Sequence, residues 1–241
     1  MSRLINVLLL AMAVVLVSPD CFATWSIIIV DPVTKEIGIA GASCTYNCYG
    51  IGSIAPGEGA IIVQAMSNND ARAEGLRMIF SNVSPEEIID ALHHERFDPE
   101  RQQYAVVTLQ NLSRPATYTG IETHEVRSAL TGVGISVQGN TLAGSDVIQK
   151  VYDAALDGRK RGLSLHEILM LALEAGAEAG GDKRCGEQRA TTAFLTVSRP
   201  DDNVKRPYLK LVIFGQKKGG QNAVRLLRTK YDRWCNKKKK R

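Results

Sequence analysis

Segments typical of strands and segments typical of helices follow one another in blocks along this sequence. Runs of β-branched and aromatic residues, separated by turn residues, predict four strands at the start, and apolar residues at helical spacing predict two helices after them. Such blocks favour an α+β fold in which helices cover the outer faces of two stacked antiparallel sheets. In chain order, the predicted segments are strands at 24–30, 36–43, 50–54 and 60–66, helices at 69–80 and from 84, strands at 103–110 and 116–119, helices at 146–156 and 165–179, strands at 191–197 and 208–214, and a helix at about 222–234.

Two local signals refine these segments. The run 60–66 is apolar enough to be a strand that is covered on both faces. Ser84 precedes Pro85 and two glutamates, and Ser164 is followed three residues later by Glu167, so we expect a helix to begin directly after each serine. Gly-rich passages at 131–134 and 138–140 follow the second set of strands.

The first 23 residues have the pattern of a cleavable signal peptide. Arg3 precedes an apolar run from Leu4 to Val17 that only Asn6 interrupts, which is too short for a membrane span of about 20 apolar residues. Ala and the fairly small Cys lie at the first and third positions before a cut after Ala23. We therefore expect an exported protein, periplasmic or extracellular, whose mature chain begins at Thr24 and has no transmembrane segment. A lipid anchor at Cys21 is the competing interpretation, but residues 18–20 lack the apolar and small character expected before a lipidated cysteine.

The remaining chain suits a single domain at 24–235, followed by a basic tail at 236–241. Residues 237–241 alone equal the formal net charge of +5, so the body is close to neutral and we expect no specific nucleic-acid partner. A solvated tail is the simplest interpretation. Loose attachment to an anionic lipid, cell-wall polymer or nucleic acid by charge alone is the alternative. The oligomeric state is left open.

Four cysteines remain after cleavage, and an even number in an exported chain favours disulfide pairing. The sequence does not choose among the three connectivities, and free thiols stay an alternative. The spacing of the cysteines and histidines completes no zinc site, so we expect no metal and no cofactor. The cysteines are Cys44, Cys48, Cys185 and Cys235.

A threonine at the chain terminus combines a hydroxyl nucleophile with a free α-amine whose pKa is about 7.7 to 8.0 in model compounds. At neutral pH this amine accepts the hydroxyl proton, so amide hydrolysis can proceed through an acyl-enzyme without a histidine. Most terminal threonines merely mark where a leader was cut. Thr24 differs because it opens a predicted strand with no slack residue before it, whereas a terminus is ordinarily frayed.

Four segments resemble the domain of unknown function 1028 family, which is itself similar to the N-terminal-nucleophile hydrolases. The similarity covers most of the chain from Thr24 to about Val197, and it implies a four-layer αββα sandwich. In that family the threonine is usually exposed by loss of the initiator methionine, so a signal cut before Thr24 would be a second route to the same terminus. The segments are 24–28, 31–38, 138–144 and 180–184.

The resemblance also implies roles for single residues. Thr24 would be the nucleophile, with Asn140 and the backbone of Gly139 stabilising an oxyanion. Asp182 would hold the terminal amine and Arg184 a substrate carboxylate, since carboxylates stabilise ammonium groups and guanidinium groups bind carboxylates in a fork. A tight turn at 139–140 and an ordinary salt bridge at 182–184 are the structural alternatives. Two polar residues near the same sheet edge, Ser43 and Asn68, are candidates for substrate binding.

One departure separates the chain from proteasome-type relatives. Those proteins carry an aspartate after the second strand and a lysine near the third, where this chain has Gly41–Ala42–Ser43 and Gly50–Ile51–Gly52–Ser53. A proteasome-like protease is therefore disfavoured. We expect an amidohydrolase acting on a small peptide, an acyl-amide or a cell-wall fragment. The alternative is a non-catalytic protein that binds an envelope ligand such as peptidoglycan on the same fold.

Overall fold

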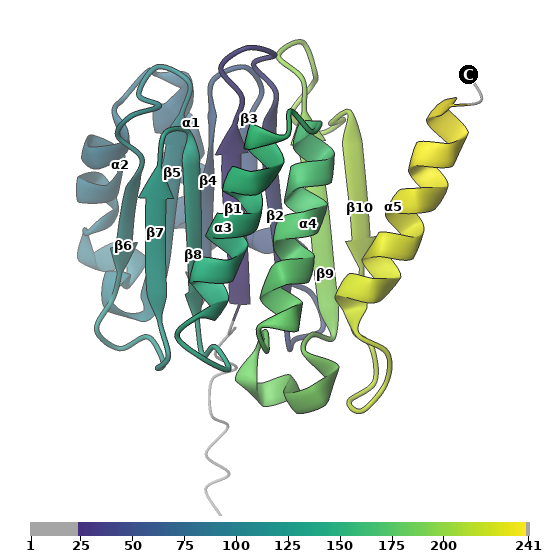
Figure 1. Ribbon diagram of the computed structural model, residues 1–241. Helices are drawn as coiled ribbons and strands as arrows, with labels where there is room; N and C mark the ends of the chain where they lie inside the picture. Colours follow the sequence, from purple (N-terminus) through teal and green to yellow (C-terminus); the bar gives the residue numbers. More distant parts are fainter. Residues whose placement is uncertain (1–23, 240–241) are drawn as a thin grey trace, which may run out of the picture.

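Two antiparallel sheets lie face to face and are flanked by helices on both outer sides (Figure 1). The computed structural model describes residues 24–239, so the predicted signal peptide and its cleavage lie outside the described residues. The six-stranded sheet has the order β10–β9–β2–β1–β8–β7 and the four-stranded sheet the order β3–β4–β5–β6. The strands are β1 (Thr24–Val30), β2 (Ile37–Ser43), β3 (Gly52–Ala55), β4 (Gly59–Ala65), β5 (Gln102–Thr108), β6 (Ala116–Thr119), β7 (Ser128–Gly132), β8 (Ile135–Asn140), β9 (Thr192–Ser198) and β10 (Leu209–Ile213).

Helices α1 and α2 pack on the four-stranded sheet, and α3, α4 and α5 pack on the six-stranded sheet. The predicted four-layer αββα sandwich is therefore confirmed. The helices are α1 (Asn69–Phe80), α2 (Pro85–Leu92), α3 (Val147–Lys160), α4 (Leu165–Glu178) and α5 (Ala223–Lys239), with short 3₁₀ segments η1 (Tyr49–Ile51), η2 (Glu95–Phe97), η3 (Pro99–Arg101) and η4 (Lys183–Gln188).

Three buried apolar clusters fill the spaces between the four layers. Alternate residues of β1 serve two of them, because successive side chains of a strand point to opposite faces. Trp25 and Ile27 lie in the cluster under the helices, whereas Ile28 and Val30 lie in the cluster between the sheets. Each of these four side chains is fully buried, and burial of one such side chain stabilises the fold by on the order of 2 kcal/mol. As a result, β1 is fixed from both faces.

The ring of Trp25 packs against the end of α4 and the segment that follows it. A Cβ added at Gly176 would lie 2.4 Å from the indole nitrogen of Trp25, and one at Gly181 would lie 2.9 Å from its ring. Gly181 also has a φ of +61, which a side chain would strain. These two glycines let the segment before Asp182 run directly over the tryptophan.

Several predicted boundaries agree with the structure and others do not. The predicted ranges of β1 and α1 are confirmed, as is the capping box of Ser84 with Glu87. The Gly-rich passages were not predicted to be strands, yet β7 and β8 form there because β1 supplies a partner that outweighs the weak strand preference of glycine. Helix α4 begins directly after Ser164 as predicted, although the Ser164 side chain makes no capping hydrogen bond, and α5 continues five residues beyond Trp234.

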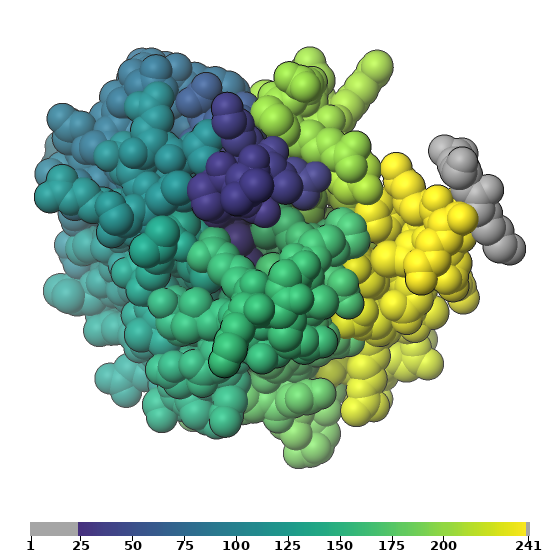
Figure 2. All heavy atoms as spheres, turned by 45° about the horizontal axis from the view of Figure 1, so that its top comes forward, coloured from purple at the N-terminus to yellow at the C-terminus, as the bar shows by residue number. Residues whose placement is uncertain are grey.

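The two ends of the sandwich are built differently. The turn at 31–36, predicted from Asp31 and Pro32, joins β1 to β2 at the end that Figure 2 brings forward. There Glu36 forms an ion pair with Arg199 of the loop before β10, and Arg159 of α3 donates to the carbonyl of Val30. Thr24 begins β1 and therefore lies at the opposite end. Among residues 24–239, no helix has the length and apolar character required to cross a bilayer.

Candidate functional site

Thr24 lies within a row of polar residues that crosses the six-stranded sheet. It is paired with Ser43 of β2 on one side and with Asn140 of β8 on the other. Ser43 is in turn paired with Thr192 of β9. Directly paired residues of neighbouring strands point to the same face, so these side chains share the face that carries Ile28 and meets the four-stranded sheet. All four are fully buried.

Two glutamines of the four-stranded sheet face this row. The amide nitrogen of Gln64 donates to the carbonyl oxygen of Thr24 at 3.4 Å and to Oε1 of Gln103 at 2.7 Å. Oε1 of Gln103 also accepts from Nδ2 of Asn140 at 3.3 Å. The amide oxygen of Gln103 therefore orients both Gln64, which donates to Thr24, and Asn140, which is paired with Thr24.

The polar chain continues away from the row between the two sheets. The hydroxyl of Ser26 donates to Oε1 of Gln64 at 2.7 Å and accepts from Nε2 of Gln138 at 2.6 Å. Ser136 donates to Oε1 of Gln138 at 2.8 Å. A buried amide without partners costs roughly 1–3 kcal/mol, so a connected chain of this kind holds its members in one arrangement.

The two most specific segments of the family resemblance meet at the Thr24 end of the sheet. Beyond Asn140, the backbone of residues 141–143 runs beside residues 181–183. Ala143 donates to the carbonyl of Gly181 at 2.9 Å, Lys183 donates to the carbonyl of Thr141 at 3.1 Å, and Leu142 is bridged to Asp182. The fold thus brings Asn140 and Asp182 to the same end of the molecule from segments 42 residues apart.

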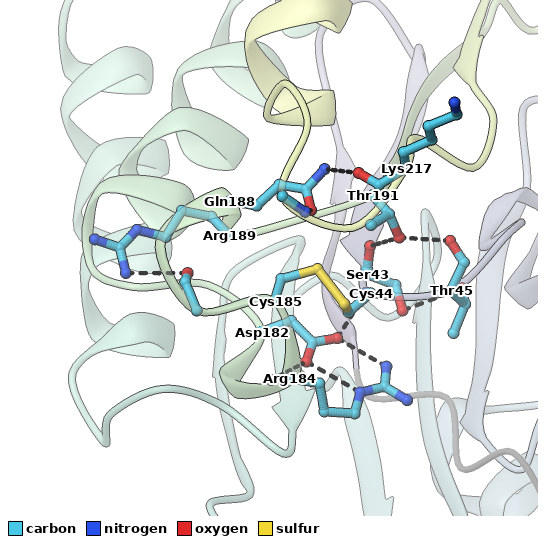
Figure 3. The surroundings of a disulfide bond; sticks show 12 residues. Ser43, Cys44, Thr45, Asp182, Arg184, Cys185, Gln188, Arg189, Thr191 and Lys217 are labelled. Carbon is cyan, nitrogen blue, oxygen red and sulfur yellow. Dashed lines mark hydrogen bonds and ion pairs between the residues drawn. A yellow bond between two sulfur atoms is a disulfide. The ribbon is translucent and has the colours of Figure 1, made fainter.

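Asp182 is buried, and both oxygens of its carboxylate accept hydrogen bonds from other residues of the protein (Figure 3). Its Oδ2 accepts the backbone N–H of Cys44 at 2.7 Å, and Arg184 donates to the carboxylate through Nε at 3.1 Å and Nη2 at 2.8 Å. The backbone N–H of Arg184 adds a fourth hydrogen bond at 3.0 Å. A carboxylate with this set of donors is fixed in place and charge-compensated by Arg184.

A disulfide joins the end of β2 to the segment that carries Asp182 and Arg184. Cys44 is bonded to Cys185, which confirms the prediction of pairing and selects one partner for Cys44, while Cys48 and Cys235 are free thiols. Cys48 is buried, and burial raises the pKa of its thiol to about 12. Next to the disulfide, Thr45 donates to the hydroxyl of Ser43 at 3.3 Å, as Figure 3 shows. The end of β2 that carries Ser43 is therefore held by a covalent bond and by hydrogen bonds.

Asn68 and Gly139, the other two residues predicted for the site, have contacts that stabilise the fold. Asn68 caps α1: its Oδ1 accepts from the backbone of Asp70 and Ala71, and its Nδ2 donates to the carbonyl of Phe97. Its described contacts therefore lie with α1 and η2 and not with Thr24. Gly139 lies inside β8, paired with Trp25 and Ser128, and a Cβ there would lie 2.8 Å from Ile148 of α3.

Three residues next to the row have strained backbone. Ala65 and Ser67 follow Gln64 with φ of +73 and +52, and Thr141 follows Asn140 with φ of +50. Residues other than glycine adopt this region at a cost of roughly 1–3 kcal/mol and do so where the surrounding structure imposes it, often at functional sites. The strain lies at both positions where the polar chain leaves a strand.

One large cavity and two of the histidines lie away from the row. A cavity of about 780 Å³ between α4, η4 and α5 is lined by charged residues that include Glu178 and Arg225, and Thr24 is not among its lining residues. His93 packs against Tyr118, and His166 contacts Tyr231. Within residues 24–239, no group of acidic, histidine and cysteine side chains has the geometry to hold a metal ion.

No sequence pattern points to the two glutamines or to Ser26. Gln64 lies in the segment 60–66, whose apolar character predicts a strand covered on both faces, and Gln103 opens the next predicted strand. A single amide in a strand covered on both faces must find a buried partner. That signal would have pointed to a polar contact between the sheets.

Fold and site together define an αββα sandwich with a buried polar row at the first residue of its central strand. The chain belongs to a family of unknown function, DUF1028, whose model matches residues 24–219. A solved structure with the same fold is that of protein SPO2555 from Silicibacter pomeroyi, also of family DUF1028: it is 23% identical, covers 88% of each chain and superposes with a TM-score of 0.73. No curated protein matches the chain.

Proposed function

We propose that the protein is an exported amidohydrolase of the N-terminal-nucleophile type, in which removal of residues 1–23 makes Thr24 the terminal residue. The observation that carries this proposal is the position of Thr24 at the first residue of β1, paired with Ser43 and Asn140. The family match also begins at Thr24. A terminal residue held on both sides by neighbouring strands has the fixed geometry that a nucleophile needs.

The proposed reaction starts with attack of Oγ of Thr24 on the carbonyl carbon of an amide. The α-amine takes the hydroxyl proton and then passes it to the leaving nitrogen as the C–N bond breaks. An ester between Thr24 and the acyl group results. Water then attacks this ester, the amine again accepts a proton, and the carboxylic acid leaves as Thr24 is regenerated.

Asn140 is suited to stabilise the oxyanion that forms in both steps. Its amide nitrogen carries two hydrogens and donates one to Gln103, so the second is available to the substrate oxygen. The carboxylate of Asp182 accepts from Cys44 and Arg184, and its proposed role is to hold the end of β2 that is paired with Thr24 and its terminal amine. Arg184, whose side chain is 31% exposed, and Ser43 are the proposed contacts to a substrate carboxylate and its backbone.

The proposed substrate is an amide of a small peptide, an acyl-amide or a cell-wall fragment, whose carbonyl carbon the threonine would attack. A protein that only binds such a fragment is the second candidate, and the absence of a lysine from residues 50–53 favours it. The two candidates differ in whether the α-amine of Thr24 must be free.

The first test is the intact mass of the protein purified from the exporting cell. A mass that begins at Thr24 supports the proposal, and any other terminus rules out the enzyme. The second test is an amidase screen with aminoacyl and N-acyl amides that compares wild type with Thr24→Ala. Thr34→Ala is the control, since Thr34 is an exposed threonine in the turn at the opposite end of β1. Activity that persists in Thr24→Ala refutes the mechanism, and binding without turnover in wild type supports the binding protein.

A further inference from the structure

The last helix carries the net positive charge of the protein. Within α5 there are seven lysines and arginines and one aspartate, while the whole chain has a formal charge of +5. The helix also begins after the last residue of the family match, which ends at residue 219. Its charge is therefore a property of this chain that the matched part does not contain.

The cations of α5 are arranged by the helix into a stripe. Ala223, Val224, Leu227 and Tyr231 form the buried face. On the other side, Arg225, Arg233 and Lys237 are exposed at multiples of four residues. Each step of four residues turns by roughly 40° around the axis, so the three side chains spread over the exposed half of the helix along roughly 18 Å at 1.5 Å per residue. Helix α5 forms an outer edge of the molecule in Figures 1 and 2.

These three side chains differ from Arg228 in their ion pairs, although Arg225 lines the cavity of about 780 Å³ together with Glu178. Arg228 forms ion pairs with Glu174 and Asp232, whereas none of the three stripe cations forms an ion pair with a residue of the described part, 24–239. Unpaired cations in a row present a surface that is complementary to a surface of regularly spaced anions.

An apolar groove runs beside the stripe. It has a volume of about 520 Å³ and lies between α5 and the end of β10. Phe214, which is 49% exposed, and Leu226 contribute apolar surface, and Lys230 and Arg233 line the same groove. Lys230 also donates to the carbonyl of Val212, on the outer edge of β10. Apolar surface next to cations matches a partner that is itself amphiphilic.

We propose that α5 and Phe214 dock the protein on an anionic lipid bilayer, with the stripe on the phosphate head groups and Phe214 in the interfacial region. Cations within a Debye length of an anionic bilayer bind it additively, and an aromatic ring at the same level adds apolar burial. Nucleic acid fits less well, because the rings of Tyr208 and Trp234 that could stack on bases are covered by Lys238.

The test is co-sedimentation of the full chain with vesicles of phosphatidylcholine mixed with phosphatidylglycerol, and with vesicles of phosphatidylcholine alone. The test variant is Arg225→Glu with Arg233→Glu. The control is Lys150→Glu with Lys160→Glu, which makes the same charge change at exposed positions of α3. All proteins share the same N-terminal residues, so binding through that segment is common to them, and vesicles without anionic lipid measure it.

Each cation at an anionic surface contributes roughly fivefold to affinity, so the α5 variant should bind the anionic vesicles more than ~25-fold more weakly. Added salt should also weaken the binding of the wild-type protein to the anionic vesicles. An equal loss in both variants, or wild-type binding that does not depend on phosphatidylglycerol, overturns the proposal.

A neutral substitution separates the bilayer from other polyanions. Phe214→Ser leaves the charge unchanged and should weaken vesicle binding severalfold while leaving the midpoint of thermal unfolding close to that of wild type. Binding of a DNA duplex is measured in parallel. Tight DNA binding together with unchanged vesicle binding by Phe214→Ser shows a general polyanion surface and overturns the lipid assignment.

Discussion

The carboxylate of Asp182 accepts the backbone N–H of Cys44 at 2.7 Å. Cys44 is also covalently bonded to Cys185, which follows Asp182 by three residues. The end of β2 and the segment after α4 are thus joined twice within a few residues. Arg184 supplies the opposite charge that the buried carboxylate needs. Since Ser43 precedes Cys44, the clamp fixes the residue that is paired with Thr24.

We predict that Asp182→Ala destabilises the protein by about 3–5 kcal/mol, because it removes the acceptor of the Cys44 N–H and the buried charge that balances Arg184. Urea unfolding followed by circular dichroism measures this. Asp157→Ala is the control, since Asp157 pairs with Arg161 at the exposed surface of α3 and should cost less than about 1 kcal/mol. Equal losses in the two variants would show that the buried carboxylate is not a structural centre.

The glutamine pair between the sheets gives a second prediction. Gln103→Met keeps the volume but removes the acceptor that the amides of Gln64 and Asn140 share, at an expected cost of about 2–4 kcal/mol. Because Gln64 and Gln103 contact each other, the double variant with Gln64→Met should lose less than the sum of the single losses, by about 0.5–3 kcal/mol. Additive losses in a double-mutant cycle of urea unfolding would contradict a coupled network.

The sequence predicted the layers and the position of Thr24 because both depend on local patterns. The segment 24–30 is rich in β-branched and aromatic residues, the apolar residues of 69–80 repeat at helix spacing, and the predicted and observed boundaries agree. The passages around Gly132 and Gly139 carry no such pattern. They become strands through pairing with β1 and with each other, a long-range effect that no short window of sequence contains.

The site was predictable in part for the same reason. The motif segments around Asn140 and Asp182 were identified, and the structure places them side by side. Their link to the four-stranded sheet was missed because the partners are single glutamines inside strands, and only the stacking of the sheets shows which amides face each other. The partner of Cys44 was likewise set by the fold, which brings residues 141 positions apart to a Cα distance of 5.6 Å.

The free cysteines provide a third prediction. Burial raises the pKa of Cys48 to about 12, and the thiolate is the reactive form, so Cys48 should resist alkylation in the folded protein. Cys235 is partly exposed and should react with iodoacetamide at mildly alkaline pH. Peptide mapping before and after unfolding in urea, without reductant, checks this. Rapid labelling of Cys48 in the folded state, or labelling of Cys185 without reductant, would contradict the assignment.

The same thiol makes stability depend on alkaline pH. A thiol whose pKa is raised on folding stabilises the protein fully below the unfolded value of 9.0. That contribution is lost as the pH rises toward about 12, because the unfolded chain releases the proton and the folded chain does not. Cys48→Ala should therefore flatten the alkaline limb of urea stability relative to wild type. Parallel alkaline curves for the two proteins would show that Cys48 ionises as freely in the folded state as in the unfolded one.

His166 gives a prediction for acid pH. Its Nδ1 lies 2.8 Å from the hydroxyl of Tyr231 on α5, and its ring packs edge-on against Trp234. Burial lowers its pKa below the ordinary 6.5, while Glu36 and Glu167 act in the opposite direction and Arg199 acts with burial. A histidine with a lowered pKa stabilises the folded state above 6.5, and this contribution is lost as the pH falls, because only the unfolded chain readily takes up the proton.

His166→Gln removes the titrating ring and keeps a polar group near Tyr231. We expect the difference in unfolding free energy between wild type and this variant to be larger at about pH 7.5 than at about pH 5.5. Urea unfolding at both pH values measures the difference, and the comparison cancels the carboxylates that titrate in both proteins. Since the ring contacts α5, protonation should also raise the exposure of Trp234 to a fluorescence quencher. An identical pH dependence in the two proteins would show that His166 is as easily protonated in the folded chain as in water.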